Sequence, residues 1–180
     1  MNDLIILGAG GFGREVAWIV ERINKISPTW KLLGFMDDEE SIQGKEINKH
    51  KVIGKIDFVK NYPNAYYVCA IGASKTREQV VGKVKEINSD IKFATIIDPS
   101  VEMSDFVSIG EGTIICPHSI ITVNIEIGSY VIINIDCTIG HDAILSDFVT
   151  LYPSVNVSGN TKIGHAVELG TGTQIIQKRL

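Results

Sequence analysis

Hydrophobic residues follow one period in the first half of the chain and a different period in the second half. In the first 95 residues, short apolar runs alternate with segments in which apolar residues recur at helical spacing. Residues 3–7 form an apolar run that ends at Gly8, which predicts a buried strand. The next apolar residues occupy the i, i+3, i+4 and i+7 positions of an amphipathic helix, and they are Val16, Ile19, Val20 and Ile23.

This alternation continues to residue 96. We predict strands over residues 31–36, 66–71 and 92–96, a short helix over 57–61 and a long helix around Val84. The polar, glycine-containing segment before the short helix predicts a loop. Strands that alternate with helices indicate a parallel sheet covered on its faces. A complete dinucleotide-binding domain needs two such halves, and this segment is too short to hold both. We therefore predict a Rossmann-like α/β half domain.

From Ile97 onward an aliphatic residue or methionine occupies every sixth position, without a gap, as far as Ile175. Four residues after each of these comes a small or β-branched residue, from Val101 to Thr173. A helix has a period of 3.6 and a strand a period of 2, so a period of six is neither. It predicts a β-solenoid with three short sides per coil. Residues three hexads apart are then neighbours in successive coils, separated by about 4.8 Å.

Glycine often follows the aliphatic residue of the hexad directly. We expect the corners of the coil to require positive φ angles, which glycine, asparagine and aspartate tolerate. The glycines in this position are Gly110, Gly128, Gly140, Gly164 and Gly170.

Composition narrows the function classes. The hydrophobic fraction of 44% and the charged fraction of 21% are typical of a globular protein. A net charge of −4 favours neither nucleic acid nor an anionic membrane as partner. No apolar run reaches the roughly 20 residues that span a bilayer, and the N-terminus lacks the basic start of a signal peptide. Three widely spaced cysteines, without any zinc-binding spacing, predict free thiols, a cytoplasmic location and no metal site.

The glycine-rich segment after the first strand predicts a phosphate-binding turn. Gly8, Gly10 and Gly13 have the spacing G-x-G-x-x-G, with Gly11 inside it, and they join a strand to a helix. The helix N-terminus and the bare backbone suit a phosphate. Asp37, at the end of the second strand, is placed to accept from a ribose hydroxyl. A nucleotide-sugar, NAD and a purely structural turn all remain open as interpretations.

His141 is the strongest catalytic candidate. It takes the third position of its hexad, at a corner of the coil, and Asp142 follows it directly. Acyl transfer from a thioester needs a base that removes a proton from the acceptor, and histidine suits this role near neutral pH. A neighbouring carboxylate orients the ring and stabilises the imidazolium. Gly159 comes three hexads later, so we expect it one coil above His141. The alternative interpretation is that His141 is only a solvated corner residue.

Several motifs together resemble those of hexapeptide-repeat acyltransferases. They are ILGAGGFGREV, GFMDD, AIGASKTR, INIDCTIGHD, DFVTLYPSVNVSGNTKIG and VELGTGTQI. More narrowly, the chain resembles the sugar acetyltransferases of the sialic-acid O-acetyltransferase type and of the bacillosamine-pathway N-acetyltransferase type. The resemblance implies a left-handed parallel β-helix, a homotrimer with active sites between subunits, and acetyl-CoA as donor. It also implies direct attack by the acceptor, without an acyl-enzyme.

The resemblance also implies roles for individual residues. His141 corresponds to the general base, Asp142 to its partner, and the backbone N–H of Gly159 to the donor that binds the thioester carbonyl. Asn134 corresponds to a polar residue near the acceptor amine, and Thr171 to a position on the cofactor side. His165 is a surface corner or a second cofactor contact. The glycine loop corresponds to a site for a UDP-linked sugar, and Asp37 and Asp38 correspond to residues that contact the uridine. Arg77 is either a phosphate ligand or a solvated residue at the start of a helix.

These observations predict two domains. Residues 1–95 form the nucleotide-sugar-binding domain, and residues 96–180 form the acyltransferase β-helix without the C-terminal cap usual in the family. The expected activity is acetyl-CoA-dependent acetylation of an amino or hydroxyl group on a sugar, nucleotide-linked in our preferred interpretation. The alternative is a nucleotide-sugar-binding trimer with weak or no catalysis.

Overall fold

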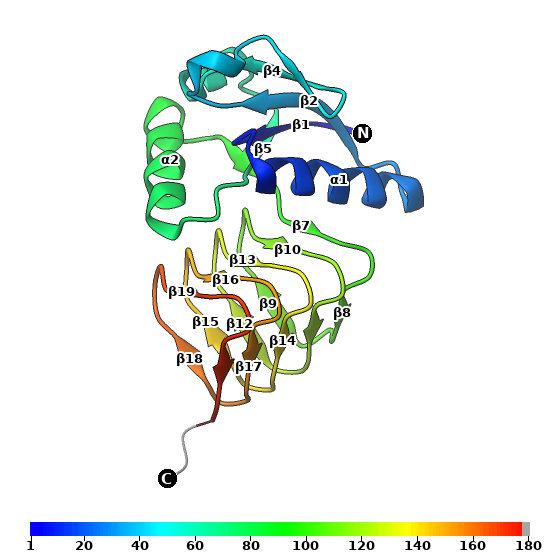
Figure 1. Cartoon of the computed structure of the whole chain (residues 1–180), viewed down its shortest axis with the longest axis vertical. Coiled ribbons are helices and arrows are strands. Elements are labelled where there is room, and N and C mark those ends of the chain that lie inside the picture. The colour runs from blue at the N-terminus through cyan, green and yellow to red at the C-terminus, as the bar shows by residue number, and fades with distance from the viewer. Residues whose placement is uncertain (178–180) are drawn as a thin grey trace. The chain divides into compact units, whose positions relative to one another are not determined.

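The computed structural model describes residues 1–177. The chain divides into two compact units, one from Met1 to Ala94 and one that begins at Thr95 (Figure 1). Each unit has its own sheets and its own core, and they are described in turn.

The first unit contains a six-stranded sheet in the order β3-β4-β2-β1-β5-β6. Its strands are parallel except for the β3–β4 pair, which is an antiparallel hairpin. The elements are β1 (Asn2–Leu7), α1 (Gly11–Ile26), β2 (Trp30–Met36), β3 (Glu46–Ile47), β4 (His50–Gly54), β5 (Tyr66–Cys69), α2 (Ser74–Ile87) and β6 (Lys92–Phe93). Two 3₁₀ helices join them, η1 (Glu40–Ile42) and η2 (Ile56–Asn61).

The core of this unit explains why the apolar runs become strands. β1 lies between β2 and β5, so its residues Leu4–Leu7 are fully buried. Central parallel strands are covered on both faces, which is why their sequence is a continuous apolar run. The helix α1 buries the apolar stripe seen in the sequence, including Val16, Ile19 and Val20.

One element of the first unit contradicts the sequence prediction. The segment expected to be a loop contains β3 and β4, and β4 adds to the sheet beside β2. The run His50–Gly54 is short, and only its pairing with β2 makes it a strand. The short helix expected at 57–61 is present as the 3₁₀ helix η2.

The second unit is a left-handed parallel β-helix, drawn as stacked coils in Figure 1. Its strands form three parallel sheets, one for each side of the coil. Sheet 1 holds β7 (Ile96–Ile97), β10 (Ile114–Ile115), β13 (Ile132–Ile133), β16 (Thr150–Leu151) and β19 (Glu168–Leu169). Sheet 2 holds β8 (Glu102–Met103), β11 (Ile120–Ile121), β14 (Thr138–Ile139), β17 (Asn156–Val157) and β20 (Gln174–Ile175). Sheet 3 holds β9 (Val107–Ile109), β12 (Ile125–Ile127), β15 (Ile144–Leu145) and β18 (Lys162–Ile163).

The register confirms the stacking rule expected from the hexad period. Ile115 pairs with Ile133, and Ile121 pairs with Ile139, so each residue meets the one three hexads further along the chain. The aliphatic position of the hexad fills the interior, with the small position beside it. Both sets form one core, which includes Ile133, Cys137, Ile139, Ala143, Leu145, Val149 and Leu151.

The corners differ from the expectation about glycine. Positive φ angles occur at the fourth hexad position, and non-glycine residues of many kinds adopt them, including Tyr130, Asp142 and Phe148. The glycines that follow the aliphatic residue do not have positive φ. At Gly110, a Cβ would lie 2.5 Å from the backbone nitrogen of Ser129 in the next coil. Glycine at that position therefore permits close approach of the neighbouring coil.

Candidate functional site

The three corners of the coil form three edges of the β-helix, and His141 lies on the edge that joins sheet 2 to sheet 3. We call this the His141 edge, and it consists of residues 104–106, 122–124, 140–142 and 158–160. The Nδ1 atom of His141 lies 2.7 Å from Oδ2 of Asp142. Because the carboxylate accepts, Nδ1 carries the proton and Nε2 of the neutral ring is left as an acceptor. The two side chains are 55% and 46% exposed, so a substrate can reach them.

Backbone hydrogen bonds fix this corner to the coils on either side. Asp142 N–H donates to the carbonyl of Val123 at 3.1 Å, and Asn160 N–H donates to the carbonyl of His141 at 2.8 Å. Asp142 has a φ of 59°, in the left-handed region that turns the chain at this corner. The two side chains therefore project from a backbone held from below and above.

The electrostatics favour an ionised Asp142. Its hydrogen bond to His141 lowers the pKa of the carboxyl group below its ordinary value, and slight burial opposes this. A carboxylate beside Nδ1 stabilises positive charge on the ring. The pair is thus suited to take up a proton at Nε2.

Gly159 lies against the imidazole of His141. The glycine is buried, and a Cβ built on it would lie 2.7 Å from both Cε1 and Nε2 of the ring. No side chain fits there beside the observed ring position. Within residues 1–177, the Gly159 amide donates no hydrogen bond to the protein.

The other predicted residues of the β-helix lie on different edges. Asn134 and Thr171 occupy corners between sheets 1 and 2, and His165 occupies a corner between sheets 3 and 1. The Oδ1 atom of Asn134 accepts from the backbone N–H of Ile135 at 2.8 Å. The ring of His165 packs edge-on against Phe148, with 5.7 Å between centroids. One chain therefore brings together His141, Asp142 and Gly159 but not these three.

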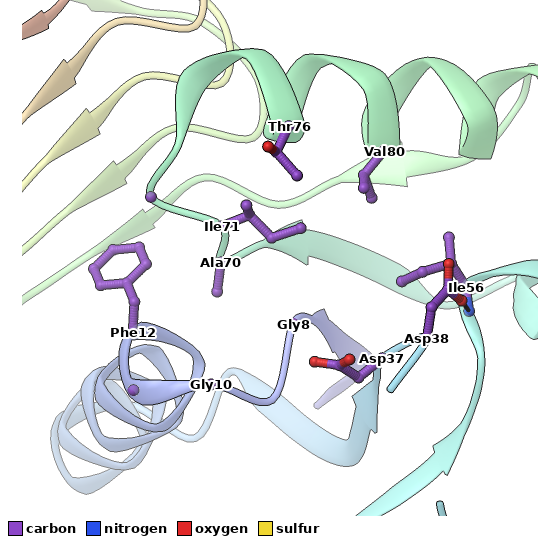
Figure 2. Close-up of a pocket in the computed structure, with 12 residues that line it drawn as sticks. Gly8, Gly10, Phe12, Asp37, Asp38, Ile56, Ala70, Ile71, Thr76 and Val80 are labelled. Atoms are coloured by element: carbon purple, nitrogen blue, oxygen red, sulfur yellow. Dashed lines mark hydrogen bonds between the residues drawn. The ribbon is translucent and has the colours of Figure 1, made fainter. Parts of the chain in front are cut away.

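A cavity of about 480 Å³ opens in the first unit at the carboxyl ends of β1 and β5 (Figure 2). The strand order runs outward from these two central strands in opposite directions, and such a switch point is where α/β sheets bind ligands. Figure 2 shows the Gly8–Phe12 turn facing α2 across this space, with the end of β2 beside it. The lining residues are Gly8, Gly10, Gly11, Phe12, Asp37, Asp38, Ile56, Ala70, Ile71, Gly72, Thr76 and Val80.

Two helices begin at this cavity. Neither α1 nor α2 has a side chain that caps its N-terminus, and neither carries an acidic residue in its first turn. The dipoles of the two helices therefore leave partial positive charge beside the cavity. Gly13 does not line the space; a Cβ there would lie 2.1 Å from the carbonyl oxygen of Gly8, so this glycine lets α1 pack on the turn.

Asp37 and Asp38 hold the loops around the cavity. Asp37 accepts from the backbone N–H of Ala9 at 2.8 Å, which ties the end of β2 to the glycine turn. Asp38 accepts from the N–H of Ile56 at 2.9 Å, and its other oxygen lies 3.3 Å from Nζ of Lys83. Each carboxylate keeps lone pairs that can accept from a ligand.

Sequence comparison finds relatives along almost the whole chain. Residues 3–84 match the family described as the PglD N-terminal domain. A protein of Escherichia coli O157:H7 named GDP-perosamine N-acetyltransferase is 31% identical over 179 residues, which are 98% of this chain and 79% of that protein. This chain belongs to the hexapeptide-repeat sugar acetyltransferases. It is therefore an acyltransferase, and the family expected from the motifs is confirmed.

Several solved structures have the same fold. The acetyltransferase domain of PglB from Neisseria gonorrhoeae FA1090 matches with a TM-score of 0.85 at 28% identity, over 97% of this chain and 82% of that one. The same domain has been solved in complex with acetyl coenzyme A, and it matches with a TM-score of 0.84. WeeI from Acinetobacter baumannii AYE matches with a TM-score of 0.84 at 27% identity, over 99% of this chain and 82% of that one. The expected fold class, an α/β half domain followed by a left-handed β-helix, is confirmed.

Arg77 of this acetyltransferase lies elsewhere than either interpretation of the sequence predicted. Its side chain is fully buried and does not line the cavity, so a solvated helix start is wrong. The guanidinium donates to the carbonyls of Ile71 and Gly72 at 2.7 and 2.9 Å. Arg77 therefore fixes the loop after β5, and that loop in turn forms one wall of the cavity.

Sequence reasoning missed the apolar part of the cavity. Ile56, Ile71 and Val80 line it, but they come from η2, the loop after β5, and α2. The only local signal was the Gly72-Ala73-Ser74 turn after a strand, which resembles the first strand-to-helix turn.

No helix in the described part of the chain is long and apolar enough to cross a membrane. Nor do residues 1–177 hold a group of three or more histidine, cysteine or acidic residues arranged for a metal ion.

Proposed function

We propose that this chain transfers the acetyl group of acetyl-CoA to an amino group of a nucleotide-linked sugar, with His141 as general base. The observation that carries the proposal is the 2.7 Å contact between His141 Nδ1 and Asp142 on an exposed corner. This contact leaves Nε2 as the acceptor of a proton. The relative named GDP-perosamine N-acetyltransferase supports an amine as the nucleophile.

The reaction is a direct attack on the thioester. The sugar amine attacks the carbonyl carbon of acetyl-CoA, and Nε2 of His141 takes a proton from the nitrogen as the C–N bond forms. The tetrahedral intermediate collapses, the C–S bond breaks, and the thiolate of CoA leaves and receives the proton from the imidazolium. Asp142 stabilises the imidazolium between these two steps.

Gly159 is proposed as the oxyanion donor. Its amide N–H has no protein acceptor within residues 1–177, and it lies one coil above His141. A donor at this place binds the carbonyl oxygen more tightly as negative charge develops in the transition state. The absence of a side chain lets a thioester approach the backbone.

The acceptor nucleotide is proposed to bind in the cavity at the carboxyl ends of β1 and β5. Two uncapped helix N-termini suit a diphosphate, and the apolar wall formed by Ile56 and Val80 suits a base. Asp37 and Asp38 accept hydrogen bonds from the nucleoside. A GDP-linked amino sugar is our first choice because of the 31% identical relative, and UDP-linked amino sugars are the second.

A complete site is proposed to need a homotrimer. Asn134, Thr171 and His165 lie on edges other than the His141 edge, so one chain does not gather them around the base. A neighbouring subunit then brings Asn134 beside the amine, and Thr171 and His165 beside the cofactor.

We propose the cytoplasm as the compartment, because three buried cysteines that form no disulfide within the described residues fit reducing conditions.

The first experiment measures release of the CoA thiol from acetyl-CoA with GDP-perosamine, a UDP-linked 4-amino sugar and sialic acid as acceptors. We expect turnover with an amino sugar, and a loss of about 10²–10⁴-fold in kcat for His141→Ala with sugar-nucleotide binding retained. Wild-type turnover in His141→Ala would refute the assignment of the base. Binding without turnover in the wild-type protein would favour the nucleotide-sugar-binding trimer instead.

Calorimetric titration tests the cavity separately. We expect binding of GDP or UDP and of the matching sugar nucleotide, and a weakened affinity in Asp37→Asn, which keeps the shape of the side chain but removes its charge. Binding of NAD in place of these ligands would contradict a sugar-nucleotide site.

A further inference from the structure

On the His141 edge, one coil has a glycine at a place where the other coils have a side chain. The second hexad position of this edge holds Ser104, Thr122, Gly140 and Ser158. Serine and threonine therefore fit beneath the next coil on this edge, so the turn does not require glycine. Gly140 directly precedes His141, so the exception lies in the coil that carries the proposed base.

The backbone of the next coil lies close to Gly140. A Cβ built on Gly140 would lie 2.5 Å from the backbone nitrogen of Gly159 and 3.0 Å from its Cα. Atoms in van der Waals contact lie about 3.5–4.0 Å apart, so no side chain fits at residue 140 while this nitrogen stays in place. The position of the Gly159 amide therefore depends on the missing side chain at residue 140.

Backbone hydrogen bonds show the same close approach. The N–H groups of Gly140 and Asn160 each join these two coils, and both bonds are 2.8 Å long. One coil below, the equivalent bonds of Thr122 and Asp142 are both 3.1 Å long. The coil above Gly140 is thus closer than the coil above Thr122, on both sides of the corner.

The edge that joins sheet 3 to sheet 1 has the same pattern. The inter-coil bonds of Gly128 and Phe148 are 2.8 and 2.9 Å long. One coil further along, Ser146 takes the second hexad position, and the bonds of Ser146 and Ala166 are both 3.0 Å long. Glycine at the second position therefore accompanies closely spaced coils, and serine or threonine accompanies wider spacing.

We propose that Gly140 is a positioning residue of the acetyl transfer. Because it has no side chain, the next coil approaches the His141 corner and brings the Gly159 amide beside the imidazole. A side chain at residue 140 would push this amide away from the ring. The inference rests on the proposed function, since it presumes that the Gly159 N–H binds the thioester carbonyl. Gly140 acts through Gly159 and does not itself contact the reacting atoms.

Two substitutions, Gly140→Ala and Gly140→Ser, test this role. Loss of a whole oxyanion donor costs about 10²–10³-fold in kcat, and we expect a displaced donor to cost about 10- to 100-fold in both variants. Serine is the residue that two other coils of this edge carry at the same position, so Gly140→Ser is expected to fold. Circular dichroism checks the fold of both variants.

The matched control is Gly110→Ala. A Cβ at Gly110 would also lie 2.5 Å from a backbone nitrogen of the next coil, that of Ser129, but on a different edge. We expect Gly110→Ala and Gly140→Ala to lose similar stability in urea unfolding. Only Gly140→Ala should lose activity, and kcat of Gly110→Ala should stay within about twofold of the wild-type value.

Infrared spectroscopy of bound acetyl-CoA, labelled with carbon-13 at the thioester carbonyl, reports the hydrogen bond directly. A donor to the carbonyl oxygen lowers its stretching frequency. We expect a lower frequency than in free acetyl-CoA for the wild type and Gly110→Ala, and a return toward the free value in both Gly140 variants. The pH midpoint of kcat should stay at its wild-type value, because the base is unchanged.

Three results would overturn the inference. They are equal kcat in Gly140→Ala and Gly110→Ala, a wild-type carbonyl frequency in both Gly140 variants, and a loss of kcat with a shifted pH midpoint, which would place the effect at His141. Failure of the proposed function is recognised separately. The carbonyl frequency in the wild type would then equal that of free acetyl-CoA, or His141→Ala would keep wild-type turnover.

Discussion

At the scale of single residues, the position of the His141 ring depends on the absence of a side chain at Gly159. The ring occupies the space that a Cβ at residue 159 would fill, and the backbone of the corner is tied on both sides to neighbouring coils. Neither residue can move far without breaking a backbone hydrogen bond. The base and the proposed oxyanion donor are therefore held at one place by the same contact.

This contact predicts the effect of a single methyl group. In Gly159→Ala, the added carbon would lie 2.7 Å from Nε2, so the imidazole must turn away. We expect kcat to fall about 100-fold, since a misplaced general base contributes little, while the circular dichroism spectrum stays that of the wild type. The control is Gly164→Ala, where the new carbon meets only Val167 at 3.9 Å. Equal activity in the two variants would contradict the proposed geometry.

At the scale of elements, two positions of the hexad have different structural requirements, whereas the sequence suggested a single requirement for positive φ at the corners. The fourth hexad position turns the chain with a positive φ, and residues with large side chains meet this demand. The second position carries glycine where the next coil approaches closely. Crowding between coils, and not backbone torsion, explains glycine at Gly110, Gly128 and Gly140.

The crowding is expected to differ between glycines in the same hexad position. Gly110→Ala would bring a carbon within 2.5 Å of a backbone nitrogen, so the coils must shift, whereas nothing lies within 4 Å of a Cβ at Gly170. We expect Gly110→Ala to lower the free energy of unfolding by about 1–3 kcal/mol, the usual cost of overpacking. Gly170→Ala should stay near the wild-type value in urea unfolding followed by circular dichroism. Similar losses of stability in both variants would show that backbone torsion, and not crowding between coils, explains glycine at this hexad position.

At the scale of the whole molecule, the chain consists of two units with separate cores. Cys69 belongs to the first unit and Cys116 and Cys137 to the second, and all three are buried and outside any disulfide within the described residues. Burial raises the pKa of Cys69 to about 12 and that of Cys137 to about 11. At pH 8 only about one thiol in a thousand or fewer is then ionised at these two positions, and the thiolate is the reactive form.

The thiols therefore report on unfolding of each unit. We expect almost no reaction with a disulfide reagent at pH 8 in the native protein, and reaction of all three thiols in denaturant. Mass spectrometry of the labelled peptides should give a different urea midpoint for Cys69 than for Cys116 and Cys137, because each unit has its own core. Fast labelling without denaturant would contradict the burial, and a common midpoint would contradict independent unfolding.

The sequence by itself determined what is periodic or local along the chain. The hexad repeat predicted the β-helix and the pairing of residues three hexads apart, because every coil repeats the same contacts. The adjacency of His141 and Asp142, and the strand–glycine–helix context of Gly8 to Gly13, needed no distant partner either.

Only the tertiary structure decided features that depend on residues far away. β4 is a strand because β2 lies beside it, and Arg77 is buried because the loop after β5 offers it two carbonyls. The apolar wall of the cavity comes from η2 and α2, which no local pattern connects to the glycine turn. Gly159 meets the His141 ring because folding stacks the coils and brings residues three hexads apart into contact.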